Sequence, residues 1–348
     1  MKNLFIIGNG FDLAHDLKTS YLDFKKYVES NDKAFFEGFY SLHMYSFDRK
    51  YENPLMTEPI NDEYESLWSD IENNMKIVNE DYILSANLEL GLEDDNPYYE
   101  DCFETAEIYL ESFIKDIPER LLENLNRWIQ SIDLSKVHKK IEYIDSDSND
   151  LFLTFNYTNV LENIYEVECD RICHIHGEVG DELAMGHLNI NRISELEKER
   201  DFEYNSFFER KTEEISPEED EQEKLEQIYE EFQSTEDHYD YKVEQLKYNL
   251  LIDYYKGTVK IPKNHIKYNK YFFNQISEVK NIYVIGHSLG DVDMEYFEEI
   301  LKRVDQKTRW NIFYYGENEK KIFEKKMLEI GIDKKNLIIK HSDLFYAW

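Results

Sequence analysis

The sequence predicts an α/β protein with an open, mostly parallel sheet that is interrupted by large helical insertions. Three observations predict this fold class. Residues 3–8 form a continuous apolar run that stops at a glycine, as a strand covered on both faces does. Residues 278–348 alternate between strand and helix patterns, which is typical of right-handed crossovers and parallel pairing. Long stretches with helical patterns separate these two regions.

The elements follow along the chain. Apolar residues recur at three- and four-residue steps over 113–132 and predict a helix, with Pro118 at its start or at a kink. Short apolar runs predict strands at 151–155, 171–175, 183–186, 282–285, 310–315 and 337–340. Helices are expected at 160–165, 294–304 and 317–330.

This order predicts a Rossmann-like nucleotide-binding core made of residues 1–30, 150–190 and 278–348. Residues 31–149 are predicted to form one helical insertion, and residues 191–277 a second, acidic one. Within the second, Ser216-Pro217 followed by Glu219 predicts a helix start, with serine as the cap and proline in the first turn.

Composition narrows the classes of partner. With 40 Lys and Arg against 74 Asp and Glu, the net charge is −34, which repels nucleic acid and anionic lipid, so neither is expected as a direct partner. The opening apolar run is too short for a signal peptide core or a membrane span, which predicts a cytoplasmic protein. The odd set Cys102, Cys169 and Cys173 fits reduced thiols and not a structural zinc site.

The first loop of chemical interest is Gly8-Asn9-Gly10-Phe11-Asp12, directly after the first predicted strand. Two glycines at a strand end let the backbone approach a pyrophosphate, whose charge is met by free amides at the next helix start. Leu13 stands where the full dinucleotide fingerprint has a third glycine, so a simple tight turn remains an alternative.

Two further loops carry polar side chains at strand ends. Asn156 follows the strand at 151–155, where its amide can donate and accept hydrogen bonds, while Thr158 or Asn159 can cap the next helix. His174 and His176 are two residues apart on a predicted strand and are therefore expected on one face. Two imidazoles beside Gly177 indicate acid–base chemistry near neutral pH.

The fourth loop runs from Gly286 to Asp293 and contains Gly286-His287-Ser288-Leu289-Gly290. This is the G-x-S-x-G pattern of a hydrolase nucleophile elbow, between a strand and a helix. A serine hydrolase would need a downstream histidine, and His341 is the candidate. That alternative leaves the opening glycines, Asn156 and His176 unexplained.

Together these loops resemble the AbiH family of bacteriophage abortive infection proteins. The segments that carry the resemblance are Leu4–His15 with Lys18–Tyr21, Phe155–Thr158, His174–Gly177, and Ile285–Leu289 with Asp291 and Asp293. More distantly, the same series is similar to the sirtuin-like NAD-consuming domains of defence systems. This second resemblance implies a sirtuin-like fold and hydrolysis of NAD+ to nicotinamide and ADP-ribose.

The resemblance also implies roles for single residues. Asn156 and His176 would be catalytic. Residues that would bind the dinucleotide are Gly8, Asn9, Gly10, Phe11, Asp12, His174, Gly286, Ser288 and Asp291. Where the sirtuin pattern has an aspartate two residues after the asparagine, this chain has Thr158. NAD is then a substrate, and no metal is expected.

Alternatives from other classes stay open. A metal-dependent hydrolase or nuclease could use His174, His176 and His187, a serine hydrolase could use Ser288, and a nucleotide sensor would bind without conversion. The expected partner is a small-molecule nucleotide, and the sequence leaves open a homo-oligomer or a phage protein as trigger.

Overall fold

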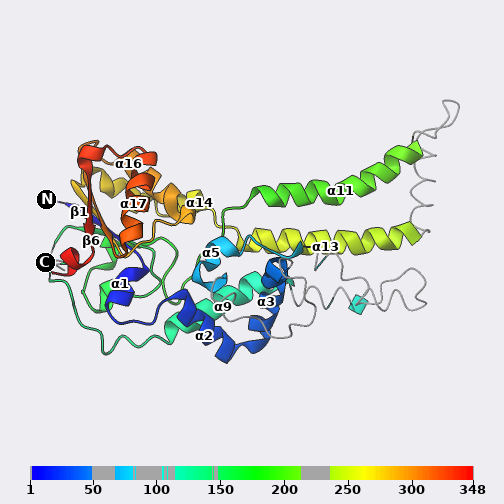
Figure 1. Cartoon of the computed structure of the whole chain (residues 1–348), viewed down its shortest axis with the longest axis horizontal. Coiled ribbons are helices and arrows are strands. Elements are labelled where there is room, and N and C mark those ends of the chain that lie inside the picture. Colours follow the sequence, from blue (N-terminus) through cyan, green and yellow to red (C-terminus); the bar gives the residue numbers. More distant parts are fainter. Residues whose placement is uncertain are drawn as a thin grey trace.

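The computed structural model describes residues 2–48, 67–80, 83, 104, 105, 108, 114–142, 144, 148–212 and 236–347. Within these residues the strands form one all-parallel sheet in the order β3-β2-β1-β4-β5-β6. The strands are β1 (Asn3–Ile7), β2 (Leu151–Thr154), β3 (Ile172–His174), β4 (Asn281–Ile285), β5 (Arg309–Tyr314) and β6 (Leu337–His341). The predicted α/β class and the open parallel sheet are confirmed (Figure 1).

The described helices surround the sheet and extend away from it. They are α1 (Asn9–Ala14), α2 (Tyr21–Asn31), α3 (Lys33–Asp48), α5 (Ile71–Asn74), α9 (Ile117–Gln130), α10 (Val160–Asn163), α11 (Asn191–Thr212), α13 (Glu236–Thr258), α14 (Pro262–Tyr268), α15 (Lys270–Gln275), α16 (Met294–Arg303), α17 (Glu317–Glu329) and α18 (Asp343–Tyr346). Pro118 stands in the first turn of α9, as expected of a helix start. The predicted helix start at Ser216 lies outside the described residues.

The predicted strand at 183–186 is wrong. This stretch contains no strand, and the adjacent His187 makes only an isolated parallel bridge with Val259. The reason is its neighbour: the chain runs beside the end of α13, and a Cβ on Gly186 would lie 2.2 Å from the Thr258 carbonyl oxygen. With a helix end alongside instead of a strand, the extended segment has no ladder to join.

Both faces of the sheet are covered, which explains the unbroken apolar runs. In β1, Leu4 and Ile6 belong to a core shared with α15, α16 and α17. Phe5 and Ile7 belong to a second core shared with α1, α10 and α18. The two sets alternate along the strand, as side chains of a pleated strand must.

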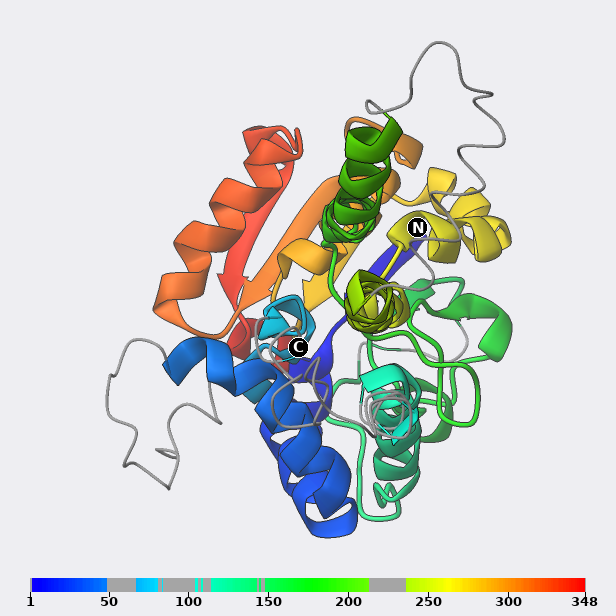
Figure 2. The same ribbon diagram turned by 90° about the vertical axis from the view of Figure 1, so that its right-hand side faces the viewer.

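The two insertions, predicted as separate segments, share one hydrophobic core. Phe39 of α3, Leu125 of α9 and Leu251 of α13 are buried in the same cluster. His43 of α3 lies 2.8 Å from the hydroxyl of Tyr254 of α13, which ties the two insertions by a buried hydrogen bond. Helices α11 and α13 then run side by side away from the sheet (Figures 1 and 2).

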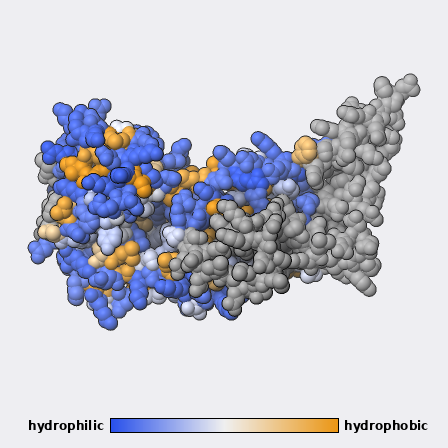
Figure 3. Space-filling view, viewed as in Figure 1, coloured by the Kyte–Doolittle hydropathy of each residue, from blue (hydrophilic) through white to orange (hydrophobic). Residues whose placement is uncertain are grey.

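The surface agrees with the high charge of the sequence. The face drawn in Figure 3 is mostly hydrophilic over the described residues, with small separate hydrophobic areas. Across the described parts of the chain, none of the helices combines the length and the apolar composition that crossing a membrane requires.

Candidate functional site

A cavity of about 620 Å³ lies at the carboxyl ends of β1, β2 and β4. The strand order reverses between β1 and β4, and ligands of open α/β sheets bind in the crevice at such a reversal. The lining residues that carry the arguments below are Gly8, Asn9, Gly10, Asp12, Tyr21, Asp70, Glu72, Asn156, Tyr157, His176, Gly286, His287, Ser288, Asp291, Asp293 and Lys326. Most of the residues predicted from the strand ends therefore meet in one place.

The opening glycines are required by close packing of two loops. The Gly8 amide donates to the Ile285 carbonyl at 2.9 Å, and the Gly10 amide donates to the Gly286 carbonyl at 2.8 Å. A Cβ on Gly8 would lie 2.5 Å from the His287 Cα, and one on Gly10 would lie 2.7 Å from the Gly286 Cα. These two amides are therefore bound to the loop after β4, while Gly8, Asn9 and Gly10 still line the cavity, so their part in binding a dinucleotide stays a prediction.

Phe11 and His174, both expected to touch the ligand, are not among the residues that line the cavity. The Phe11 ring is buried against His15 and Tyr165, with centroid distances of 4.6 and 5.7 Å. His174 lies 3.1 Å through Nδ1 from the Asn156 carbonyl oxygen and 2.7 Å through Nε2 from Glu162 Oε1. His174 therefore contacts the backbone of Asn156 from outside the cavity.

His174 and His176 do not share a face, because β3 ends at His174 and the chain then turns through Gly177, whose φ is 83°. Period-two alternation holds only within a strand. His176 instead packs edge-on against the ring of Phe155, with centroids 5.0 Å apart, and 5.7 Å from that of Tyr296 on α16.

Asn156 is buried and held by one acidic partner. Its Nδ2 donates to Asp12 Oδ1 at 2.9 Å, and the Thr158 hydroxyl donates to Asp12 Oδ2 at 2.6 Å. The amide orientation is thereby set, and the buried Oδ1 of Asn156 has no hydrogen-bond partner. Burial raises the pKa of Asp12 to about 7, although both hydrogen bonds act in the opposite direction.

Like Thr19 through its Oγ1, His176 is another lining residue with an unpartnered buried atom. Its Nε2 lies 3.5 Å from Asp293 Oδ1, beyond good hydrogen-bond geometry, and makes no other contact of that kind. Burial, followed by the positive charge of Lys260, lowers the pKa of His176 to about 4, although Asp293 raises it. The imidazole is therefore neutral at pH 7, so one of its two ring nitrogens is a hydrogen-bond acceptor.

A buried group of charges stands behind His176. Lys260, whose side chain is fully buried, places Nζ 2.9 Å from Asp293 Oδ1 and 3.3 Å from Glu72 Oε1. His287 Nε2 lies 3.5 Å from Asp293 Oδ2, while its Nδ1 accepts the Leu289 amide, which assigns the proton to Nε2. Glu72 belongs to α5 in the first insertion, and Asp293 belongs to the loop after β4.

The charges set the protonation states of this group. Burial alone raises the pKa of Asp293, but Lys260 and the two imidazoles outweigh it and bring the pKa well below the usual range. Burial raises the pKa of Glu72 to about 7, with Lys260 opposing. Asp293 is therefore ionised throughout the physiological range, and Glu72 changes its charge near neutral pH.

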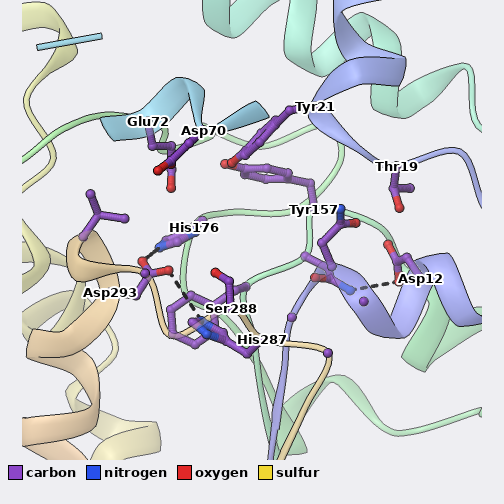
Figure 4. Close-up of a pocket in the computed structure, with 18 of the residues that line it drawn as sticks. Asp12, Thr19, Tyr21, Asp70, Glu72, Tyr157, His176, His287, Ser288 and Asp293 are labelled. Atoms are coloured by element: carbon purple, nitrogen blue, oxygen red, sulfur yellow. Dashed lines mark hydrogen bonds and ion pairs between the residues drawn. The ribbon is translucent and has the colours of Figure 1, made fainter. Parts of the chain in front are cut away.

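Tyr21 of α2, Tyr157 after β2, and Asp70 and Glu72 at α5 also line the cavity. In Figure 4 the rings of Tyr21 and Tyr157 lie beside each other with their hydroxyl groups toward the end that holds Glu72 and Asp70, and Asp12 lies at the opposite end. Burial, followed by the negative charge of Glu72, raises the pKa of both tyrosines well above the usual value.

Sequence reasoning missed Lys260, Glu72 and Tyr21 as parts of the site. A signal was present in Thr258-Val259-Lys260-Ile261-Pro262, where one lysine stands in an otherwise uncharged stretch. A lysine is almost never fully buried unless it is paired. The sequence could not show which carboxylates pair with it.

The structure separates the residues of the alternative hydrolases. His187 is buried beside Thr258 Oγ1 at 3.2 Å and, like His174, is not among the lining residues of the cavity. His341, on β6, lies 3.0 Å from the Tyr315 carbonyl oxygen and 3.3 Å from Asp343. Ser288 lines the cavity, but the positive φ angles of this loop belong to Gly286 and Leu289 and not to Ser288, so it lacks the strained nucleophile of an elbow.

One group among the described residues could hold a metal ion, namely Glu162, His174 and Glu178, whose ligand atoms lie within 4.8 Å of one another. It differs from the set of three histidines considered from the sequence. His174 within it already pairs with Glu162, and this carboxylate and the Asn156 carbonyl raise the pKa of His174 although burial lowers it. The raised pKa favours the protonated imidazole, which opposes metal binding.

Fold and site together define a Rossmann-like α/β protein with an acidic cavity at the reversal point of its sheet. The model of the AbiH family, described as bacteriophage abortive infection, matches residues 4–314. The chain therefore belongs to the AbiH family, and the family resemblance of its loops is confirmed. Comparisons with curated proteins and with solved structures found no match.

Proposed function

We propose that this abortive infection protein acts by hydrolysing NAD+ to nicotinamide and ADP-ribose. One observation carries the proposal: Asn156 Oδ1 and His176 Nε2 are buried, lack hydrogen-bond partners and belong to residues that line one cavity. Unsatisfied buried polar atoms are rare in folded proteins and are a feature of sites that meet a ligand. An amide acceptor and a neutral imidazole are the groups that a water-dependent cleavage of a glycosidic bond needs.

The roles follow from the atoms that are available. Asn156 presents a carbonyl oxygen because its amide nitrogen is bound to Asp12, so it accepts a hydrogen bond from a ribose hydroxyl or from the attacking water. His176 accepts the proton of that nucleophile, directly or through a hydroxyl. As the bond between ribose C1′ and nicotinamide breaks, its electron pair neutralises the ring nitrogen, and water oxygen bonds to C1′.

The electrostatics of the cavity orient the substrate. Lys326, which binds the Leu289 carbonyl and Asp291 at 2.7 Å each, is the one lysine among the described lining residues. We place the pyrophosphate beside it, at the loop that follows β4, and the nicotinamide riboside toward Asn156 and His176. The backbone amides of Gly8 and Gly10 take no part, because they are bound to the β4 loop.

The test compares NAD+ turnover by the purified chain and by variants. Asn156→Ala and His176→Ala are each expected to lower turnover by at least about 100-fold, the scale of a lost acid–base or positioning group. Asn163→Ala and His138→Ala, which remove exposed residues of the same types, serve as matched controls. Nicotinamide and ADP-ribose are measured by chromatography.

The same four variants are compared in cells during phage infection, where NAD+ is measured over time. The protective chain is expected to deplete NAD+, and the Asn156→Ala and His176→Ala variants to lose both depletion and protection. Unchanged NAD+ levels with intact protection, or turnover that survives both substitutions in a folded protein, would refute the proposed reaction.

A further inference from the structure

The charged residues that line the cavity are mostly acidic. Among its described lining residues, Asp12, Asp70, Glu72, Asp291 and Asp293 are acidic and Lys326 alone is basic. Lys326 is already paired with Asp291. Lys260 faces Glu72 and Asp293 from behind and neutralises one of them, and the two lining imidazoles are neutral. A negative potential therefore remains inside a partly desolvated cavity, where charges act more strongly than in water.

The excess is concentrated at the end beneath the first insertion. Glu72, Asp70 and Asp293 lie there around the hydroxyl groups of Tyr21 and Tyr157 (Figure 4). A separate observation indicates that the cavity holds a ligand. Asn156, beside Asp12, and His176, beside Asp293, are more than nine-tenths buried, line the cavity and each carry a buried polar atom without a hydrogen-bond partner.

Burial raises the pKa of two carboxyl groups of the cavity, Asp12 and Glu72. A buried carboxylate in this state is stabilised by a cation that enters its surroundings. A second phosphate-like anion would instead add to the repulsion. The cavity therefore favours a ligand whose buried part carries positive charge.

We infer that the end of the cavity formed by Tyr21, Glu72 and Tyr157 selects a cationic aromatic ring, so that the protein binds the oxidised, pyridinium form of the nicotinamide cofactor in preference to the neutral reduced form. This inference rests on the proposed function and adds the charge state of the substrate to it. The same field stabilises the positive charge that builds on ribose C1′ in the transition state and loses its hold on the ring once nicotinamide leaves as a neutral molecule.

The probes are two small molecules of nearly equal shape, N1-methylnicotinamide, a cation, and nicotinamide, which is neutral. Their dissociation constants are measured on the full chain by calorimetry at pH 8, where Glu72 is mostly ionised. The cation is expected to bind about tenfold more tightly, the ratio that one extra charge interaction at a partly buried site gives. Equal affinity, tighter binding of the neutral ring, or no binding of the cation would overturn the inference.

Glu72→Gln keeps the shape of the side chain and removes its charge. The ratio of the dissociation constants of nicotinamide and N1-methylnicotinamide is then expected to fall to about threefold or less. Asp70→Asn, at an exposed position beside it, is a second variant whose ratio is expected to fall by a smaller factor. Glu298→Gln, at an exposed position on α16, is the matched control with an unchanged ratio. A ratio that is the same in both cavity variants and in the control would also overturn the inference.

The outcome separates this inference from the proposed reaction. A chain that prefers the cation but does not cleave NAD+ supports the charge selection and contradicts the hydrolysis. A chain that cleaves NAD+ and binds both rings equally supports the hydrolysis and contradicts the charge selection.

Discussion

The two ends of the cavity are built in different ways. The Asp12 end is local to the sheet: Asp12 in α1 and Asn156 and Thr158 after β2 come from strands that are neighbours. The Glu72 end is assembled from α5, the segment after α13 and the loop after β4, which meet through Lys260. The first end therefore depends on the sheet, and the second depends on the insertions being docked onto it.

The difference predicts where the site is fragile. Fixed strand ends hold the first end even if the insertions shift. The second end is held by buried charges that are stable only as a complete group, because removing one partner leaves the others buried without compensation. The Glu72 end is therefore complete only where α5 and the segment after α13 are packed together.

The largest expected effect comes from Lys260→Met, which leaves Glu72 and Asp293 buried without their cation. The free energy of unfolding at pH 7 is expected to fall by about 3–5 kcal/mol, the range for a broken buried ion pair. Urea denaturation measures it. Lys256→Met, which breaks the exposed pair with Glu197, is the control and is expected to change stability by less than about 1 kcal/mol. Similar losses in the two variants would remove the distinction between the ends.

The next effect concerns the Asp12 end and its dependence on pH. The folded pKa of Asp12 is raised to about 7 from an ordinary 3.8, so between these values the folded protein keeps a proton that the unfolded chain releases. The contribution of Asp12 to the free energy of unfolding therefore decreases as the pH rises from about 4 to 7. Buried histidines with lowered pKa values, such as His176 and His287, act in the opposite sense over part of this range.

Asp12→Asn isolates the contribution, since asparagine resembles the protonated acid. The stability of the variant relative to the parent is expected to rise by about 1.4 kcal/mol per pH unit between pH 4.5 and 6.5, the value for one proton. Denaturation at several pH values measures this difference. A flat difference across that range would show that the Asp12 carboxyl titrates normally, and the Asp12 end would then be less desolvated than its burial indicates.

The fold and the Asp12 end could be predicted from the sequence because both depend on local patterns. An unbroken apolar run ending in Gly8 predicts a strand and its turn, and Asn156 follows another such run. Carboxyl ends of parallel strands meet at one edge, so these residues had to converge. His174 was misplaced for a local reason as well, because alternation was extended past the end of β3.

The Glu72 end could not be predicted, because nothing in a local pattern says that residue 72 meets residue 260. The pairing depends on how two insertions pack on each other in the core that contains Trp68 and Leu251. Likewise, the two glycines indicated a phosphate loop, while the contact that requires them comes from Gly286, far away in the sequence. A glycine indicates that another part of the backbone can come close, but it does not identify that part.

That contact gives a third, smaller prediction about the sheet-built end. Gly8→Ala places a Cβ against the backbone of the β4 loop, at 2.5 Å from the His287 Cα and 2.6 Å from the Gly286 carbonyl oxygen. The free energy of unfolding is expected to fall by about 1–3 kcal/mol, the range for overpacking. Gly290→Ala is the control, because its nearest neighbour is the Ser288 hydroxyl at 3.6 Å and its φ of −57° suits alanine. An unchanged stability in Gly8→Ala would mean that the two loops are free to separate.

The smallest expected effect distinguishes a lining residue from a nucleophile. Ser288 stands in the loop between the two ends, and His341, its candidate partner, is bonded to Tyr315 and Asp343. Ser288→Ala is therefore expected to change NAD+ turnover by less than about threefold, because a side chain that only lines the cavity contributes about one ordinary hydrogen bond at most. Turnover and labelling by a serine-directed fluorophosphonate are measured on the same sample. Labelling of the parent chain, with loss of both labelling and turnover in the variant, would make Ser288 the nucleophile and move the chemistry away from Asn156 and His176.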